Sequence, residues 1–209
     1  MRVAFFGGTF DPIHRGHLAI ARAAAEEFRL DEVMFAPVGR QPLKAKTAEA
    51  PYADRIHMVE LACENSGSAA KLIVSQIDAP KANGEPNYTV DTLNELARSQ
   101  PDAELFAVSG ADSFLTLRSW RAPERLLETA EWIVVSRPGF PLTAEELSAV
   151  GLTAARRERV HVLSTVQEDV SASELRRRLR AGEDCSDLVP QPVLEYIASK
   201  GLYGGRVRA

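Results

Sequence analysis

Short runs of apolar residues alternate along this chain with longer segments whose apolar positions recur every three or four residues. The short runs are mostly continuous, which is typical of parallel strands that are covered on both faces. Six of them predict strands, at residues 3–6, 32–36, 72–76, 104–108, 132–136 and 160–163.

Helical spacing fills the intervals between these runs. The apolar positions are Leu18, Ala21, Ala25 and Phe28 in the first interval, and Ile56, Val59 and Cys63 in the second. Pro51 fits the first turn of the second helix. The alternation of strands and helices predicts an α/β fold with a doubly wound, Rossmann-like parallel sheet.

The C-terminal part of the chain has a different pattern. Ser171 and Glu174 have the spacing of a capping box, which predicts a helix that runs through Arg180. Pro192 and Gly201 mark the start and the end of a further short helix. These elements predict a small helical segment after the last strand.

We expect a single domain over residues 1–209, with the sheet core in residues 1–165 and a C-terminal helical subdomain in residues 166–209. Between the predicted strands and helices, residues 78–87 carry proline, glycine and asparagine. We expect this loop to be the most mobile, followed by residues 38–50.

Composition excludes several classes of protein. A hydrophobic content of 45% and a charged content of 26% are ordinary for a globular protein, and a net charge of −4 argues against a broad nucleic-acid surface. No apolar run approaches the roughly 20 residues of a membrane helix, and the N-terminal run is too short for a signal peptide. Cys63 and Cys185 form no CxxC, so neither a disulfide scaffold nor a zinc knuckle is indicated. We expect a cytoplasmic protein.

The first predicted strand leads into the stretch GGTFDPIHRGH, residues 7–17. Gly7 and Gly8 leave no Cβ between a phosphate and the backbone, and N–H groups of the loop and of the next helix would face the anion. Ligands of open α/β sheets bind beyond the carboxyl ends of the strands, where this loop lies. The chain has no GxxxxGK[ST], and no GxGxxG follows the first strand. A Walker-type loop is therefore excluded, and a nicotinamide-cofactor site is disfavoured.

His14 and His17 lie at the start of the next predicted helix and share a face. Their N–H groups could hold charge that develops on a phosphoryl oxygen or on a departing pyrophosphate. Two other interpretations stay open from the residues alone. In the first, the two rings are solvated polar groups. In the second, they join Asp11 in a zinc site of unusual spacing.

The stretch from Gly7 to His17 resembles the signature of the HxGH nucleotidylyltransferase superfamily, and residues 170–176 resemble its second motif. In that superfamily a nucleophilic phosphate attacks the α-phosphate of ATP or CTP, and pyrophosphate leaves. The resemblance implies that the catalytic residues are His14, His17, Lys44 and Arg176. It implies that the ATP site consists of Gly7, Gly8, Thr9, Phe10, His14, His17, Ser171, Ser173 and Arg176.

Three further stretches, at residues 86–93, 110–113 and 187–190, resemble the bacterial nicotinate-mononucleotide adenylyltransferases. The resemblance extends from Val3 to Tyr203 and implies adenylyl transfer from ATP to nicotinate mononucleotide in NAD biosynthesis. Mg²⁺ is then expected to be carried by the ATP phosphates, without a metal site on the protein. A homo-oligomer remains compatible with the sequence.

The implied substrate site consists of Tyr88, Thr89, Asp112, Trp120 and Lys44. A helix that begins near Thr89 would direct N–H groups at the pyridine carboxylate, and Trp120 would stack on the ring with Tyr88 beside it. Asp112 would accept hydrogen bonds from ribose hydroxyls. The structural alternatives are a packing role for Trp120 and an N-cap role for Asp112.

The chain departs from the family in the segment that contains Lys44. It has QPLK where PPHK is usual, so Leu43 replaces a histidine, and Ser173 stands where threonine is frequent. Four other functions stay open: adenylyl transfer to nicotinamide mononucleotide or to phosphopantetheine, cytidylyl transfer, and nucleotide binding without turnover.

Overall fold

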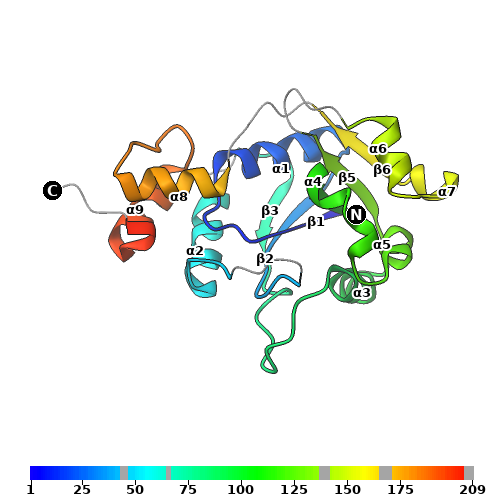
Figure 1. The fold of residues 1–209 in the computed structure, drawn as a ribbon, viewed down its shortest axis with the longest axis horizontal. Coiled ribbons are helices and arrows are strands. Elements are labelled where there is room, and N and C mark those ends of the chain that lie inside the picture. Colours follow the sequence, from blue (N-terminus) through cyan, green and yellow to red (C-terminus); the bar gives the residue numbers. More distant parts are fainter. Residues whose placement is uncertain (43–46, 65–66, 137–141, 165–170, 205–209) are drawn as a thin grey trace.

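Six parallel strands form one sheet in the order β3-β2-β1-β4-β5-β6 (Figure 1). The computed structural model describes residues 1–42, 47–64, 67–136, 142–164 and 171–204. The strands are β1 (Arg2–Gly8), β2 (Glu32–Pro37), β3 (Lys71–Val74), β4 (Glu104–Gly110), β5 (Glu131–Val135) and β6 (Val160–Leu163). All six predicted strands are confirmed, with ends that differ by two residues at most.

Helices cover both faces of this sheet (Figure 1). Along β1, Ala4 and Phe6 belong to one buried cluster while Val3 and Phe5 belong to the other, so successive side chains enter opposite cores. This two-sided burial explains the unbroken apolar runs and confirms the doubly wound α/β fold. The helices are α1 (Arg15–Glu27), α2 (Tyr52–Cys63), α3 (Thr89–Ser99), α4 (Ala111–Phe114), η1 (Leu117–Ser119), α5 (Pro123–Thr129), α6 (Ala144–Ala149), α7 (Ala154–Arg157), α8 (Ala172–Ala181), α9 (Gln191–Lys200) and η2 (Leu202–Gly204).

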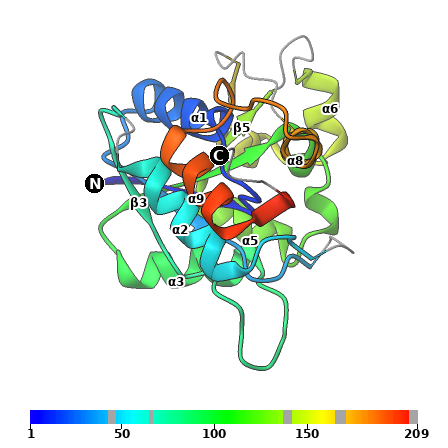
Figure 2. The same ribbon diagram turned by 90° about the vertical axis from the view of Figure 1, so that its left-hand side faces the viewer.

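The C-terminal helices share the core on the face that carries α1 and α2. Leu175 of α8 and Ile197 of α9 are buried in the same cluster as the α2 residue Met58. Figure 2 shows α9 in front of α2, where the Tyr196 hydroxyl donates a hydrogen bond of 2.8 Å to Asp54. The predicted C-terminal helices are confirmed, and the boundary at residues 165 and 166 stays a prediction.

Local details differ from two expectations. Ser171 is the N-cap of α8, but its side chain makes no capping hydrogen bond. Glu174 lies 2.6 Å from the guanidinium of Arg177, and this opposite charge one turn away holds the carboxylate that the capping box needed. The predicted capping box is therefore wrong. Pro51 is the N-cap of α2 and not a first-turn residue.

The loop at residues 78–87 is bonded to the segment that follows β2. Asn87 accepts a hydrogen bond of 3.0 Å from the Arg40 N–H and donates one of 2.9 Å to the Ala79 carbonyl. Gly39 approaches the same loop so closely that an added Cβ would lie 2.5 Å from the Pro80 nitrogen. The mobility expected for residues 78–87 and 38–50 stays a prediction, but these contacts connect the first loop to the start of the second.

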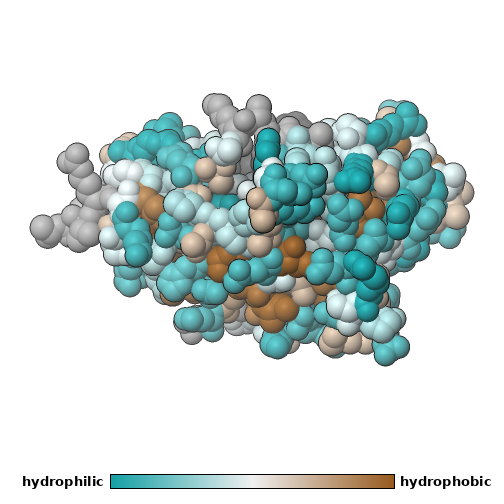
Figure 3. Space-filling view, turned by 90° about the horizontal axis from the view of Figure 1, so that it is seen from below, coloured by the Kyte–Doolittle hydropathy of each residue, from teal (hydrophilic) through white to brown (hydrophobic). Residues whose placement is uncertain are grey.

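The surface is mixed in character. In Figure 3, hydrophilic residues surround a group of apolar residues near the middle of the face seen from below Figure 1. Among the described residues the large apolar side chain that is exposed is Met1. No helix in the described ranges is long and apolar enough to cross a membrane.

Candidate active site

A cavity of about 410 Å³ opens at the carboxyl ends of the central strands β1 and β4. The strand order reverses between these neighbours, and α/β sheets bind ligands at such a point because the flanking loops diverge. The described residues that line the cavity include Gly7, Gly8, Tyr88, Thr89, Asp112 and Trp120. The cavity thus brings the glycine pair of the predicted ATP site together with four residues of the predicted substrate site, whereas His14, His17 and Arg176 are not among its lining residues.

The glycine pair at the end of β1 serves the packing of two phenylalanines. A Cβ on Gly7 would lie 2.7 Å from the Phe5 ring, and one on Gly8 would lie 2.8 Å from the Phe10 ring. Phe10 has a left-handed backbone with φ of 46° and is buried, with its ring centroid 5.0 Å from that of His17. The packing of these rings therefore requires glycine at both positions, in addition to the phosphate contact predicted for their backbone.

His14 and His17 stack on one another at the start of α1, with ring centroids 3.7 Å apart and an interplanar angle of 26°. His14 is the N-cap, and its backbone N–H donates a hydrogen bond of 3.2 Å to Nδ1 of His17. Since Nδ1 is the acceptor, a neutral His17 carries its proton on Nε2. The predicted shared face is confirmed.

Burial keeps both imidazoles uncharged at neutral pH. It lowers the pKa of His14 to about 4, and it lowers the pKa of His17 well below the usual value, with a further contribution from the charge of a protonated His14. His14 is only 5% exposed, so the alternative of solvated rings is wrong for that residue. The pair can act as neutral hydrogen-bond donors.

Two buried polar atoms of this loop have no hydrogen-bond partner among the described residues: Thr9 Oγ1 and His14 Nδ1. An unpaired buried polar atom costs roughly 1–3 kcal/mol, so native chains seldom leave one without a role. Both atoms belong to the stretch that the motif assigns to phosphate binding. Their chemistry fits a polar ligand rather than a purely structural loop.

The Asp11 carboxylate accepts three hydrogen bonds and is not available as a metal ligand. Its Oδ1 accepts hydrogen bonds from the Ala50 N–H at 3.0 Å and from the Tyr203 hydroxyl at 2.6 Å, and its Oδ2 accepts from the Glu49 N–H at 2.7 Å. The geometry therefore gives no support to the zinc site on Asp11, His14 and His17. Within the described ranges no cluster of three or more His, Cys, Asp and Glu residues could hold a metal ion.

Arg176 reaches the same loop from α8. Its NH1 donates to the Asp11 carbonyl at 2.6 Å, its NH2 donates to Ser173 Oγ at 3.4 Å, and its Nε lies 3.4 Å from a Glu49 carboxylate oxygen. The fold thus joins the two halves of the motif pair, and it leaves Ser171 exposed at the start of α8. Lys44 and Leu43 lie outside the described residues.

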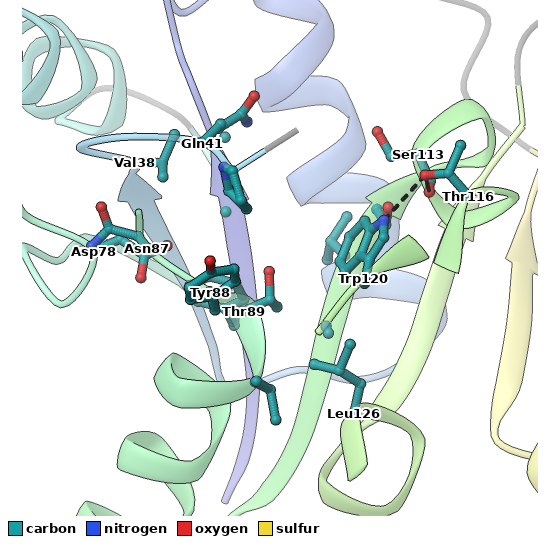
Figure 4. A pocket seen from close by; sticks show the side chains of 18 of the residues that line it. Val38, Gln41, Asp78, Asn87, Tyr88, Thr89, Ser113, Thr116, Trp120 and Leu126 are labelled. Carbon is teal, nitrogen blue, oxygen red and sulfur yellow. Dashed lines mark hydrogen bonds between the residues drawn. The ribbon is translucent and has the colours of Figure 1, made fainter. Parts of the chain in front are cut away.

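Aromatic side chains face one another across the cavity. Figure 4 shows Tyr88 and Thr89 on one side and Trp120 on the other. The Trp120 Nε1 donates to Thr116 Oγ1 at 3.1 Å, and its ring meets Trp132 edge-on with centroids 5.9 Å apart. Trp120 therefore combines the packing role with a ring that lines the cavity. Tyr88 is the N-cap of α3, so the predicted helix start at Thr89 is confirmed.

Asp112 is the second residue of α4, which follows β4 directly. Gly110 occupies the N-cap of α4, so the alternative that Asp112 is the N-cap is wrong. The physical reason is that α4 begins two residues earlier than this alternative requires, which puts Asp112 inside the first turn. Its side chain is exposed and lines the cavity.

Sequence reasoning missed two buried residues that support the site. Arg55 of α2 is 2% exposed and donates to the carbonyls of Thr9 at 2.7 Å and Ala50 at 3.3 Å. Asp78 lines the cavity and accepts a hydrogen bond from the Thr92 hydroxyl, while burial raises the pKa of its carboxyl. An arginine among the apolar positions of a helix was the one available signal for the first, and the second had none.

Comparison with known proteins agrees with this geometry. Residues 5–178 match the family model described as cytidylyltransferase-like. The chain belongs to the cytidylyltransferase-like family. It is 39% identical over 213 aligned residues to a probable nicotinate-nucleotide adenylyltransferase of Rubrobacter xylanophilus, which covers 100% of this chain and 94% of that protein. It is also 39% identical over 202 residues to the protein of the same name from Thermomicrobium roseum, covering 97% and 91%. Such identities over nearly full lengths put the chain among the nicotinate-nucleotide adenylyltransferases and confirm the resemblance expected from the motifs.

The fold has counterparts among solved structures. A Plasmodium falciparum nicotinic acid mononucleotide adenylyltransferase complexed with NaAD superposes with a TM-score of 0.79 at 19% identity, covering 99% of both chains. A putative nicotinate-nucleotide adenylyltransferase from Vibrio parahaemolyticus gives a TM-score of 0.65 at 20% identity, covering 97% and 96%. At these identities the likeness concerns the fold.

Proposed function

We propose that this chain transfers the adenylyl group of ATP to nicotinate mononucleotide, which yields nicotinate adenine dinucleotide and pyrophosphate in NAD biosynthesis. One observation carries the proposal: a cavity at the β1–β4 junction extends from the glycine pair of the motif loop to an aromatic side at the start of α3. The first side suits a polyphosphate and the second suits a flat ring with an anionic substituent. The names of the full-length relatives agree with this pairing.

The transfer is a direct displacement at the α-phosphorus. A 5′-phosphate oxygen of the mononucleotide forms a bond to the α-phosphorus, and the bond from that phosphorus to the bridging oxygen of the β-phosphate breaks. The electron pair of the broken bond leaves with pyrophosphate. Because the attacking phosphate is already an anion, the reaction needs no general base, and the protein contributes positioning and charge stabilisation.

The histidine pair supplies neutral donors in this scheme. With Nδ1 of His17 occupied by the His14 backbone N–H, the free donor of His17 is Nε2–H. We assign that donor and the His14 ring to the α-phosphate and the departing oxygen, with Thr9 and the backbone of residues 7–10 around them. A buried, uncharged donor keeps its hydrogen at neutral pH and needs no reorganisation during the reaction.

We assign the β- and γ-phosphates to the C-terminal motif, which contains Arg176. Arg176 has several N–H donors, and its present partners include the Asp11 carbonyl and the Glu49 carboxylate. A triphosphate would bind the guanidinium more strongly than these groups, because it carries several negative charges and can accept two parallel hydrogen bonds from the guanidinium. Ser171, Ser173 and Lys44 complete this assignment.

Mg²⁺ enters this scheme with ATP. The Asp11 carboxylate is occupied by three donors and is not available as a ligand, and we expect the ion to bind the triphosphate. Mg²⁺ keeps several water ligands in such sites and neutralises charge on the leaving pyrophosphate. A homo-oligomeric state and a cytoplasmic location stay predictions.

The acceptor site rests on the aromatic side of the cavity. Trp120 would stack on the pyridine ring with Tyr88 beside it, and Asp112 would accept hydrogen bonds from the ribose. The first N–H groups of α3, at Thr89, favour a carboxylate over a carboxamide, whose NH₂ would oppose them. These features support the acid as substrate.

Pyrophosphate release tests the proposal. The protein is assayed with ATP and Mg²⁺ in parallel on nicotinate mononucleotide, nicotinamide mononucleotide and phosphopantetheine, and we expect the first to react fastest. Equal rates on the first two would contradict the acid preference, and activity on phosphopantetheine alone would contradict the acceptor class. ATP binding without pyrophosphate release from any acceptor would indicate a nucleotide-binding module.

A further inference from the structure

Among the described side chains that line the cavity, carboxyl groups outnumber cationic groups. Among the described residues that line it, Asp78 and Asp112 carry carboxyls, and Arg121 is the one cation. The proposed acceptor is itself an anion with a phosphate at one end and a carboxylate at the other. An anion entering a cavity that holds two carboxyls needs a compensating positive charge, and Arg121 is the described lining residue that supplies it.

Arg121 lies at the aromatic end of the cavity. Its guanidinium carbon is 4.7 Å from the centroid of the Tyr88 ring. Tyr88 is the N-cap of α3, and Thr89 and Val90 of the first turn also line the cavity. The guanidinium therefore lies beside the helix start, where both the N–H groups and the positive charge attract the same kind of ligand.

The donors of Arg121 are not consumed by its ion pair. Arg121 NH1 lies 3.7 Å from a carboxylate oxygen of Asp91, and the two side chains are 59% and 48% exposed. That distance is too long for a hydrogen bond, so Asp91 balances the charge without holding the guanidinium in one orientation. The planar fork is left to match a carboxylate in two parallel hydrogen bonds.

Backbone geometry fixes this arginine next to the stacking ring. Trp120 precedes it, and Ala122 follows it with a left-handed φ of 50° before Pro123 begins α5. A left-handed non-glycine residue costs free energy and persists where the surroundings hold it. This turn lies between α5 and the two lining residues Trp120 and Arg121.

We propose that Arg121 is a specificity-determining residue that pairs with the ring carboxylate of nicotinate mononucleotide. This inference rests on the proposed function. The assignment to the carboxylate follows from position, because Arg121 lies with the aromatic residues, whereas the phosphate end of the substrate belongs at the β1 loop. A carboxamide offers no charge to the guanidinium and presents its NH₂ to the same donors, so Arg121 favours the acid.

Matched variants test this role. R121Q removes the charge from the cavity, and R125Q removes the same charge from an exposed residue of α5 outside the described lining. Titration calorimetry in the absence of ATP measures the binding of nicotinate and nicotinamide mononucleotides to both variants. We expect R121Q to weaken nicotinate mononucleotide about tenfold and nicotinamide mononucleotide by less than about twofold, the scale of one charged hydrogen bond. R125Q should change neither affinity.

Ionic strength gives a second readout. Because Arg121 is exposed, raising the salt concentration should reduce the difference between wild type and R121Q for the acid, while the amide shows little salt dependence. R121K should keep part of the acid preference, since it keeps the charge and loses the planar fork.

The outcomes separate this inference from the proposed function. Equal weakening of both mononucleotides by R121Q, no weakening, or an equal effect of R125Q would each overturn the role of Arg121. A wild type that binds the acid selectively through Arg121 but releases no pyrophosphate would refute the proposed function and leave the inference standing. A wild type that binds neither mononucleotide would overturn both.

Discussion

The hydroxyl of Tyr203 donates a hydrogen bond of 2.6 Å to the Asp11 carboxylate, which joins residues 192 positions apart in the chain. Both residues are buried, and burial raises the pKa of Tyr203, so the phenol stays protonated and remains a donor. Asp11 also receives the Glu49 and Ala50 N–H groups, while its carbonyl receives Arg176. One carboxylate thus connects the motif loop, the segment before α2 and the C-terminal turn.

Tyr203→Phe should lower kcat/KM for ATP about tenfold, because it deletes one donor to Asp11 and loosens the loop that carries the motif. The free energy of unfolding should fall by about 1–2 kcal/mol. Steady-state kinetics and urea denaturation measure the two effects. Tyr196→Phe is the matched control, since it deletes a hydroxyl that donates to Asp54 at 2.8 Å on the α2–α9 contact. An equal kinetic effect of both variants would show that the Tyr203 contact acts only through stability.

His14→Ala and His17→Ala should each lower kcat at least ~100-fold, the scale of losing one preorganised donor at a phosphoryl group. Pyrophosphate release under saturating ATP and nicotinate mononucleotide measures the change. His57→Ala serves as control, because His57 is exposed and lies 3.2 Å from Glu60 on the surface of α2. A near-normal kcat in either of the first two variants would refute the assigned role.

Stability should fall as the pH falls from 6.5 towards 4. The unfolded chain binds a proton at His14 in this interval, whereas the folded chain holds the pKa of that ring at about 4. The unfolded state therefore binds more protons, and the free energy of unfolding rises with pH by up to roughly 1.4 kcal/mol per unit for such a group. Urea denaturation between pH 4.5 and pH 7, at about half-unit steps, measures the slope.

The comparison with His14→Gln isolates this histidine. Asp78 has a raised pKa and contributes with the opposite sign, so the total slope alone does not identify one group. The slopes of the free energy of unfolding against pH for wild type and His14→Gln should differ in this interval by an amount that corresponds to nearly one bound proton. Identical slopes would mean that the buried imidazole does not titrate as assigned.

Gly8→Ala should destabilise the protein by about 1–3 kcal/mol, because the new Cβ would lie 2.8 Å from the Phe10 ring in a packed cluster. The ring would have to shift, and it contacts His17, so kcat should fall as well. Thermal and urea unfolding together with pyrophosphate release measure both changes. Gly110→Ala is the control for stability, since no atom lies within 4 Å of its added Cβ.

The fold was readable from the sequence because each strand carries its own signal. Continuous apolar runs such as 104–108 and 132–136 bury both faces, which predicted a covered parallel sheet but not the order of its strands. The glycine loop and the histidine pair were readable for a similar reason. His14 and His17 lie within one helical turn of each other, so their spacing alone predicted that they share a face.

Features that depend on distant residues were not readable. The Tyr203–Asp11 contact and the Arg55 hydrogen bonds to Thr9 and Ala50 arise only once the chain is folded. The capping box expected at Ser171 failed for a local reason instead, because Arg177, three residues after Glu174, holds its carboxylate. Local pattern therefore predicts which residues form the loop, and tertiary packing decides what holds it.

The bond between Tyr203 and Asp11 has a consequence for the order of assembly during synthesis. All six strands leave the ribosome before residue 203 does, so the sheet can form while the motif loop still lacks one of its buried partners. Nucleotide affinity should therefore appear late on a growing chain, after the sheet has already become resistant to proteolysis. Nascent chains stalled before and after residue 203 would separate these two moments.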